Sequence, residues 1–586
     1  MQFGGVRLQR NVPCVLRDGV KLYADVYCPN GTDPLPVLLM RQPYGKSLAS
    51  TVVCAHPVWY ANQGYMVVVQ DVRGRGESEG EFYPYLHEAS DGYDAVEWAA
   101  KLPRSNGKVG MYGFSYQGAT QWAAASLRPP HLAAIAPAMC ASDMYRGAFY
   151  PRGSFALGEL RTWAFQLARD TARRAGDAEA EAYCARMMAS AGEASQLPIS
   201  DADDALARYF PAYYDWVEHP EYDAYWEQFN WLKPGANATV PALLIGGWYD
   251  YILDGTLLSF ETLQGLRGEK GEAPCDRLLI GPWDHIPWGR FAGGVDHGPS
   301  ADGNVHREQL KWFDYWLKGK EDALPANEPR VLYYEPGSGV WRRADALPGT
   351  AAVTAGKRTL YLGNDGRPAN GALGGGRLNA EKGAPSVDTP DVFVYDARLP
   401  MRVESYLPVD RSQAQERYEI LVYTGEPLAE AISLLGAPIA TVRCQALGGP
   451  TDLVAVLTAV DADGKARLLS VGRAEIDSGA CPADDGPCEA TVPMRMTAAR
   501  LPAGARLRLE LTGSAFPLFA RHMNGVRLAE QFGLGPEQLH MATVAVYANG
   551  TSSYLELPLA PEIQYELRSD DDERDDGRNV RDVRGA

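Results

Sequence analysis

A serine flanked by glycines is the residue of this sequence best suited to nucleophilic chemistry. Residues 113–118 read Gly-Phe-Ser-Tyr-Gln-Gly, and Ser115 falls between a strand-like run at 108–112 and a helix-like run at 119–127. A serine on a tight strand-to-helix turn exposes its hydroxyl at the sheet edge, where the next backbone amide also points. The usual motif is Gly-x-Ser-x-Gly, and here the second glycine comes one position later. Taken alone, the motif also fits an ordinary glycine-rich loop.

A serine nucleophile needs a base, and a histidine base needs a carboxylate to orient it. His285 follows the apolar run 278–281 after a short loop, and Asp250 follows the apolar run 242–246 in the same way. Each therefore lies just past the carboxyl end of a predicted strand, where open parallel sheets build their sites. The chain order Ser, Asp, His is that of α/β-hydrolases. We predict that Ser115, Asp250 and His285 form a catalytic triad.

Other residues compete for these roles. Asp254 is a second candidate for the acid, but it lies a turn further into the following segment. Asp284 adjoins His285 and cannot easily reach around to its ring. His56 and His87 are the rival bases, but both precede the serine, which breaks the chain order.

Acyl transfer also needs hydrogen-bond donors aimed at the developing oxyanion. The backbone amide of Tyr116 is one. The second usually comes from a loop after an earlier strand, and here that loop reads Arg-Gln-Pro-Tyr-Gly-Lys at 41–46. The Tyr44 hydroxyl is a donor that could reach the site, although a buried structural tyrosine explains the local sequence equally well.

The elements that must position these residues form an interrupted α/β pattern. Short apolar runs at 37–40, 66–70, 108–112 and 132–137 predict buried strands, and 90–100 predicts a helix with Ser90 as its N-cap. Strand, helix and strand at this spacing predict a parallel α/β sheet. From 145 to 236 the strand-like runs give way to helical patterns, including a long one at 171–191, and then return.

After about residue 350, short alternating segments separated by glycine-rich turns predict a β-sandwich or jelly roll. The expected strands lie at 359–362, 392–395, 418–423, 440–444, 453–460, 506–511 and 543–547. The fold class is therefore α/β, an α/β-hydrolase with an inserted helical cap and a C-terminal jelly roll. The predicted boundaries are 1–144 and 237–350 for the hydrolase domain, 145–236 for the cap, 351–568 for the jelly roll and 569–586 for a disordered tail.

Composition limits the partners. The 586 residues carry a formal net charge of -18, which argues against binding to the phosphates of nucleic acids or anionic membranes. No apolar run is long enough for a signal peptide or a membrane span, so we expect a cytoplasmic protein. The nine cysteines form no CxxC pair, so we expect no metal site, and Cys481 and Cys488 are the one pair that could join under oxidising conditions.

Five segments together resemble a known family. They are 41–46 (RQPYGK), 70–84 (QDVRGRGESEGEFYP), 113–118 (GFSYQG), 246–250 (GGWYD) and 282–285 with the preceding glycine (GPWDH). In this order they are similar to the family that joins cocaine esterase with X-Pro dipeptidyl peptidases and α-amino-acid ester hydrolases. The resemblance extends into 453–473 and 513–519 and is weakest in the helical insert.

The resemblance implies an α/β-hydrolase domain, a helical cap and a jelly roll, with no cofactor. It implies that Ser115, Asp250 and His285 are the triad and that Tyr44 and the Tyr116 amide form the oxyanion hole. We expect a small-molecule ester or amide substrate, with a homodimer as a candidate assembly.

The resemblance also bears on the substrate. In the α-amino-acid ester hydrolases, acidic residues closely follow the triad aspartate, whereas here Tyr251, Ile252 and Leu253 follow Asp250. This difference favours an apolar or aromatic acyl group. Ile252 and Trp163 match pocket positions of the cocaine-esterase branch, although Trp163 could equally serve helix packing. An amidase or X-Pro dipeptidyl peptidase using the same triad, and a non-catalytic binding protein on this scaffold, are the alternatives.

Overall fold

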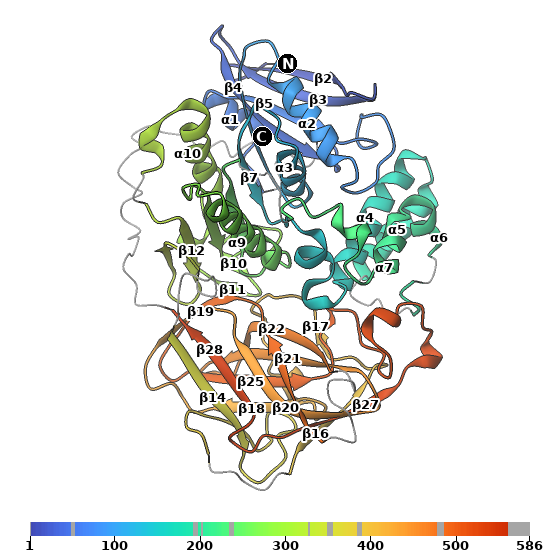
Figure 1. Cartoon of the computed structure of the whole chain (residues 1–586), viewed down its shortest axis with the longest axis vertical. Helices are drawn as coiled ribbons and strands as arrows, with labels where there is room; N and C mark the ends of the chain where they lie inside the picture. Colours follow the sequence, from blue (N-terminus) through green and yellow to red (C-terminus); the bar gives the residue numbers. More distant parts are fainter. Residues whose placement is uncertain are drawn as a thin grey trace, which may run out of the picture.

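The computed structural model describes residues 2–47, 53–190, 197–200, 203–233, 240–325, 328–347, 356–383, 389–476 and 486–560. An α/β part, built from the described residues between 2 and 347, sits above a strand-rich part built from those between 356 and 560 (Figure 1). The predicted tail at 569–586 lies outside the described residues, and so does Cys481, the cysteine that could join Cys488 under oxidising conditions.

The α/β part is organised around one 11-stranded sheet of the described residues. From β5 through β4, β6, β7, β8 and β9 to β12, neighbouring strands run parallel, while β1–β3 and β13 pair antiparallel at the edges. In sheet order the strands are β1 (Gln2–Phe3), β2 (Val6–Val15), β3 (Lys21–Pro29), β5 (Met66–Asp71), β4 (Leu35–Gln42), β6 (Ser105–Phe114), β7 (Leu132–Ala138), β8 (Leu243–Gly247), β9 (Arg277–Gly281), β12 (Val331–Glu335) and β13 (Val340–Ala344).

Helices cover both faces of this sheet. One face packs under α2 (Glu88–Ala99), α3 (Tyr116–Ser126) and α9 (Leu253–Glu269), and the other under α1 (Pro57–Asn62) and α10 (Val305–Lys318). Within β4, Val37 and Leu39 join the first core while Leu38 and Met40 join the second, because successive side chains of a strand point to opposite faces. All four are fully buried. The continuous apolar runs that predicted these strands therefore reflect burial on both faces.

A helical segment is inserted in the chain between β7 and β8, two strands that are neighbours in the sheet. It comprises α4 (Leu157–Arg174), α5 (Ala178–Ser190), α6 (Asp204–Tyr209), α7 (Ala212–Glu218) and α8 (Ala224–Glu227), preceded by the short turns η1 (Tyr145–Phe149) and η2 (Pro151–Gly153). The expected single helix at 171–191 is wrong. The chain turns at Gly176, whose φ of +75° lies in the left-handed region that glycine tolerates, and this ends one helix before the next begins.

The predicted start of the helix at 90–100 is also wrong. Helix α2 begins at Glu88 with His87 in the N-cap position, and the Ser90 hydroxyl donates to the His87 carbonyl at 3.2 Å. The Glu88 carboxylate is buried and pairs with Arg41 Nη1 at 2.5 Å. This pair draws the first turn of the helix into the core, two residues earlier than the polar pattern of the sequence suggested.

The strand-rich part contains a 13-stranded sheet of described residues, most of it antiparallel. Its core is formed by alternating residues of facing strands, among them Leu453, Ala455 and Leu457. The strands are β14 (Gly356–Asn364), β15 (Gly376–Asn379), β16 (Asp391–Asp396), β18 (Leu421–Gly425), β19 (Ile432–Gly436), β20 (Ile439–Leu447), β21 (Thr451–Val460), β22 (Ala466–Ile476), β23 (Cys488–Pro493), β24 (Thr497–Leu501), β25 (Arg506–Thr512), β27 (Met541–Val546) and β28 (Tyr554–Leu559).

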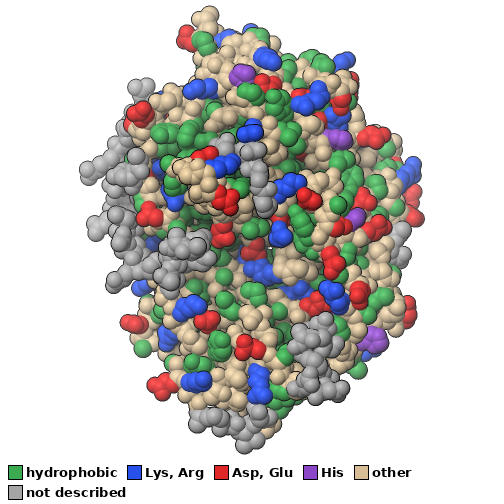
Figure 2. All heavy atoms as spheres, viewed as in Figure 1, with side chains coloured by type: hydrophobic (Ala, Val, Ile, Leu, Met, Phe, Trp, Pro, Cys, Tyr) green, Lys and Arg blue, Asp and Glu red, His purple; other side chains and the backbone are tan. Residues whose placement is uncertain are grey.

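Two short pairs complete the strands, β10 (Phe291–Ala292) with β11 (Val295–Asp296) and β17 (Arg402–Val403) with β26 (Phe516–Pro517). The remaining short helices are η4 (Pro299–Ala301), η5 (Glu321–Ala323), η6 (Ala414–Glu416), η7 (Leu528–Glu530) and η8 (Pro536–Gln538). On the face shown in Figure 2, acidic and basic side chains are interspersed. No helix within the described ranges is both long and apolar enough to cross a membrane.

Candidate active site

Ser115 stands at the turn between β6 and α3. Its backbone dihedrals are φ 58° and ψ -125°, a conformation that is costly for any residue other than glycine. The Ser115 amide donates to the carbonyl of Ala138 at 2.9 Å, which ties the turn to the end of the neighbouring strand β7. A strained turn held at the carboxyl edge of a parallel sheet is the arrangement that projects a serine hydroxyl out of the sheet.

The two glycines of the motif are explained by close approach. A Cβ added to Gly113, whose φ is +131°, would lie 2.5 Å from Cβ of Gln117. A Cβ added to Gly118 would lie 2.5 Å from Sγ of Cys140 and 2.9 Å from the Ala138 carbonyl oxygen. The second glycine therefore comes one position late because α3 crosses closest to the segment after β7 at residue 118.

His285 and Asp250 meet Ser115 at the same edge. The Nε2 atom of His285 lies 3.0 Å from Oγ of Ser115, and Nδ1 lies 2.8 Å from Oδ1 of Asp250. Asp250 follows β8 and His285 follows β9, and these neighbouring parallel strands bring both loops to one place. The Asp250 carboxylate is fully buried, and its Oδ1 also accepts the Ile252 amide at 3.1 Å.

The charge on Asp250 governs the basicity of the histidine. Burial alone would lower the pKa of His285, but the charge of the Asp250 carboxylate and its hydrogen bond outweigh this effect. The carboxylates of Glu159 and Asp284 act in the same direction, so the pKa of His285 is raised above its ordinary value of 6.5. The Tyr251 ring lies against the imidazole, with 4.9 Å between the ring centroids.

The competing residues have other roles in the structure. Asp254 forms an ion pair with Arg152. His56 caps helix α1, where its Nδ1 accepts the Val58 amide at 3.1 Å, and His87 precedes helix α2. The structure brings none of the three into the row formed by Ser115, His285 and Asp250.

The two predicted oxyanion donors are placed differently: Tyr116 directly follows Ser115 in the chain, and Tyr44 lines the cavity that contains it. The Tyr44 hydroxyl lines the same cavity as Ser115 and accepts a hydrogen bond from Nε1 of Trp163 at 3.2 Å. Burial raises the pKa of Tyr44 to about 12, so its hydroxyl keeps its proton at neutral pH. Tyr116 is the first residue of α3, where helix geometry leaves backbone N–H groups free to donate. Its side chain points elsewhere and donates to Glu88 at 2.8 Å.

A cavity of about 230 Å³ opens above the row. Both predicted pocket residues line it: Trp163, whose ring stacks on Trp216 at 5.4 Å, and Ile252, which is 4% exposed. Its walls are mostly apolar and aromatic, and the lining includes Tyr85, Phe114, Ala141, Met144, Phe149, Leu160, Tyr251 and Ile286.

Two residues that influence the site were not identified by the sequence analysis. Glu159 lines the cavity and, within the described chain, forms no hydrogen bond or ion pair, and burial raises its pKa to about 7. It stands one helical turn before Trp163, so the spacing of α4 could have indicated it. Arg495 comes from the strand-rich part and donates to the Asp250 carbonyl, with its guanidinium 3.7 Å from the centre of the Tyr406 ring. No local sequence signal indicates this contact.

The fold and the row of serine, histidine and aspartate side chains define the α/β-hydrolase class. Residues 18–287 match the family of X-Pro dipeptidyl-peptidases (S15 family), and residues 324–553 match the X-Pro dipeptidyl-peptidase C-terminal non-catalytic domain. The chain is 31% identical to cocaine esterase from Rhodococcus sp. (strain MB1 Bresler) over 90% of its own length and 95% of that protein.

Solved structures show the same fold. An α-amino acid ester hydrolase has a TM-score of 0.75, and an aminopeptidase from a Thaumarchaeota archaeon of marine sediment has a TM-score of 0.74. Each is 22% identical, over 95% of this chain and 97% of the other. The chain belongs to the family of serine hydrolases that includes cocaine esterase and the X-Pro dipeptidyl-peptidases.

The Arg495 contact leads to a test of how the site is held. Replacing this buried arginine by methionine (Arg495→Met) removes the donor to the Asp250 carbonyl while keeping most of the side-chain volume. We expect kcat to fall by about tenfold or more, because small displacements of a catalytic group cost large factors in rate. The matched control is Arg506→Met, since Arg506 also donates to a backbone carbonyl, that of Gly425 at 3.0 Å, but does not line the cavity above Ser115. Equal kcat values for both folded variants and the unaltered enzyme would contradict this role.

Proposed function

We propose that this protein is a serine carboxylesterase that hydrolyses esters with an apolar or aromatic acyl group through an acyl-enzyme. The observation that carries the proposal is the continuous row from Ser115 Oγ to His285 Nε2 at 3.0 Å and from His285 Nδ1 to Asp250 at 2.8 Å, at the floor of an aromatic cavity. The membership in a family of serine hydrolases supports it.

The proposed reaction has two steps. His285 Nε2 takes the proton of the Ser115 hydroxyl as that oxygen attacks the ester carbonyl carbon, and Asp250 stabilises the resulting imidazolium. The Tyr44 hydroxyl and the Tyr116 amide donate to the oxyanion. His285 then gives its proton to the departing alcohol, leaving an acyl group on Ser115. In the second step His285 deprotonates a water molecule as its oxygen attacks the acyl carbonyl carbon. The bond from that carbon to Ser115 Oγ then breaks, His285 returns the proton to Oγ, and the acid is released.

We also propose that helices α4–α8 act as a cap over the site and that the C-terminal strands form a jelly roll. The cap role rests on α4, which supplies Glu159, Leu160 and Trp163 to the cavity wall. The apolar members of this wall, Leu160 and Trp163, favour a hydrophobic acyl group.

The function is tested with a panel of p-nitrophenyl esters that vary in acyl group, beside the matched p-nitroanilides. We expect aromatic and medium-chain esters to react fastest, and Ser115→Ala to remove turnover while the melting temperature stays within a few degrees. A fluorophosphonate probe should label the unaltered enzyme and not the variant. Turnover that survives in Ser115→Ala, or anilides cleaved as fast as esters, would refute an esterase acting through this serine.

The proposed role of Tyr44 is tested by Tyr44→Phe, which removes only the hydroxyl. We expect kcat to fall by about 10²–10³, as for the loss of other oxyanion donors. Because Trp163 also loses a hydrogen-bond acceptor, Trp163→Phe serves as the control and should lower kcat less. An unchanged kcat in a folded Tyr44→Phe variant would exclude the hydroxyl from the oxyanion hole.

Glu159 favours a second candidate function, the hydrolysis of esters or amides that carry an amino group on the acyl side. It is a carboxylate that lines the cavity with no partner among the described residues. A buried carboxylate stabilises a substrate ammonium group, because each charge compensates the desolvation of the other. With a pKa of about 7, Glu159 becomes charged as the pH rises through neutrality.

Two matched substrates distinguish the candidates: L-phenylalanine methyl ester and methyl 3-phenylpropanoate, which differ only in the amino group. If Glu159 binds the amine, the amino ester has the higher kcat/KM and Glu159→Gln lowers that preference by about tenfold or more. If the acyl group is simply apolar, Glu159→Gln leaves the preference unchanged.

With either substrate, the pH dependence of kcat/KM tests the coupling between Glu159 and His285. The acid limb of kcat/KM, set by His285 losing its proton above pH 6.5, should move to lower pH in Glu159→Gln, because Glu159 helps to raise the pKa of His285. A limb that stays in place would contradict the coupling.

A further inference from the structure

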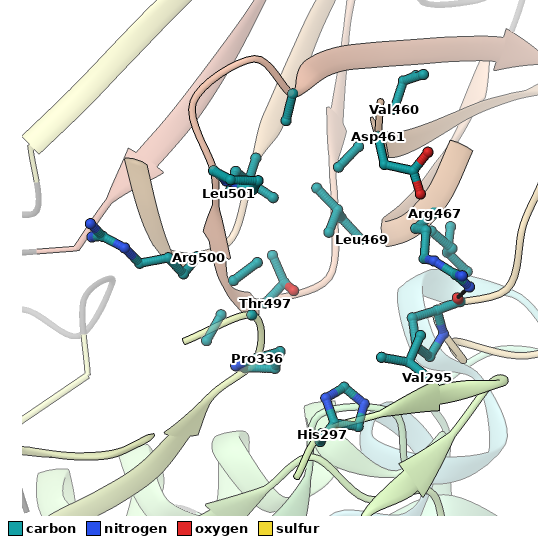
Figure 3. A pocket seen from close by; sticks show the side chains of 18 of the residues that line it. Val295, His297, Pro336, Val460, Asp461, Arg467, Leu469, Thr497, Arg500 and Leu501 are labelled. Carbon is teal, nitrogen blue, oxygen red and sulfur yellow. Dashed lines mark hydrogen bonds between the residues drawn. The ribbon is translucent and has the colours of Figure 1, made fainter. Parts of the chain in front are cut away.

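A second cavity, of about 200 Å³, lies between the two parts of the molecule. It shares no lining residue with the cavity above Ser115. On the hydrolase side it is bounded by Tyr249, Val295 and Pro336, and on the other side by the β21–β22 turn and by β24. Figure 3 shows the two sides facing each other, with Leu469 and Thr497 across from His297.

The surfaces of this second cavity are mainly apolar. Val460, Leu469 and Leu501 line the C-terminal side together with four alanines. Charged side chains of both signs, Asp461, Arg467 and Arg500, also border it. Because these charges do not share one sign, they favour a neutral ligand over an ion.

The His297 side chain borders this cavity and forms no hydrogen bond within the described part of the chain. His297 is 8% exposed, its ring points into the cavity, and its Nε2 atom is buried without a hydrogen-bond partner among the described residues. The backbone of the residue is fixed, since its amide donates to the Arg290 carbonyl at 2.8 Å and its carbonyl accepts the Tyr334 hydroxyl. A buried polar atom without a hydrogen bond is unfavourable, so a ligand that supplies the bond would be favoured.

The chemistry of the ring sets the kind of group it would bind. Burial lowers the pKa of His297 to about 4, so the ring is uncharged at neutral pH. A neutral imidazole nitrogen either donates or accepts one hydrogen bond, depending on the tautomer, and a hydroxyl group can satisfy both cases.

Size limits the ligand further. An engineered protein cavity of about 150 Å³ lined by aliphatic and aromatic side chains binds benzene, so a cavity of about 200 Å³ has room for one substituted ring. We propose that the interdomain cavity is a binding site for a small neutral phenol or aromatic alcohol, whose ring contacts Tyr249, Leu469 and Leu501 and whose hydroxyl pairs with Nε2 of His297.

The test compares 4-methylphenol with p-xylene, in which a methyl group replaces the hydroxyl, by calorimetry and ligand-observed NMR on the full chain. We expect 4-methylphenol to bind about three- to tenfold more tightly, the range expected for one hydrogen bond to a buried group. The variant His297→Phe keeps a ring of similar size but removes the nitrogen, so it should abolish this preference. Binding in the cavity above Ser115 would not respond to that change.

The control variant is His306→Phe, which alters a partly buried histidine that packs on Trp59 and does not line the cavity. It should retain the preference for 4-methylphenol. The comparison of the two ligands on the unaltered chain does not depend on the folding of any variant, and a crystal soaked with 4-methylphenol should show the hydroxyl beside His297. Absence of saturable binding, equal binding of the two ligands, or a preference that survives His297→Phe would overturn the proposal.

Discussion

The backbone conformation of Ser115 is the constraint on which the rest of the site depends. A serine with φ 58° and ψ -125° is disfavoured by about 1–3 kcal/mol, so the surrounding structure must hold it there. The Ala138 carbonyl binds its amide, and the glycines at 113 and 118 let the strand, the turn and the helix approach closely enough to do so. The same turn places the Ser115 hydroxyl beside the start of α3, where the first backbone amides have no partner within the helix.

The buried carboxylate of Asp250 imposes a second constraint. A charge without contact to water needs hydrogen bonds and nearby compensating groups. The Ile252 amide and the His285 ring supply two of them, and Arg495 fixes the loop from the strand-rich part. The C-terminal part therefore does more than pack against the hydrolase domain, since it supplies a buried cation directly behind the acid of the row.

The sequence predicted those features whose signals are local. Continuous apolar runs predicted strands β4 to β9, because strands buried on both faces do not need alternating polar and apolar residues. Asp250 and His285 could be found directly after two of these runs, because the carboxyl ends of parallel strands lie at one edge of the sheet. The features that the sequence did not predict depend on tertiary contacts between distant residues. The early start of α2 depends on the buried pair of Glu88 with Arg41, and the Arg495 contact joins residues 245 positions apart. Glu159 is an intermediate case. Its helical spacing from Trp163 could be recognised in the sequence, but its burial could not.

The catalytic cavity joins an apolar wall to two titrating groups, and each group affects the other. The carboxylate of Glu159 raises the pKa of His285, and the imidazolium form of His285 lowers the pKa of Glu159. Since the pKa of Glu159 is about 7 and that of His285 is raised above 6.5, the charge of the cavity changes with pH. A protonated Glu159 presents a neutral wall suited to an apolar acyl group, whereas an ionised Glu159 suits an ammonium group and strengthens His285 as a base. In the proposed reactions the same carboxylate therefore links the choice of substrate to the basicity of His285, so a substitution at this position affects both.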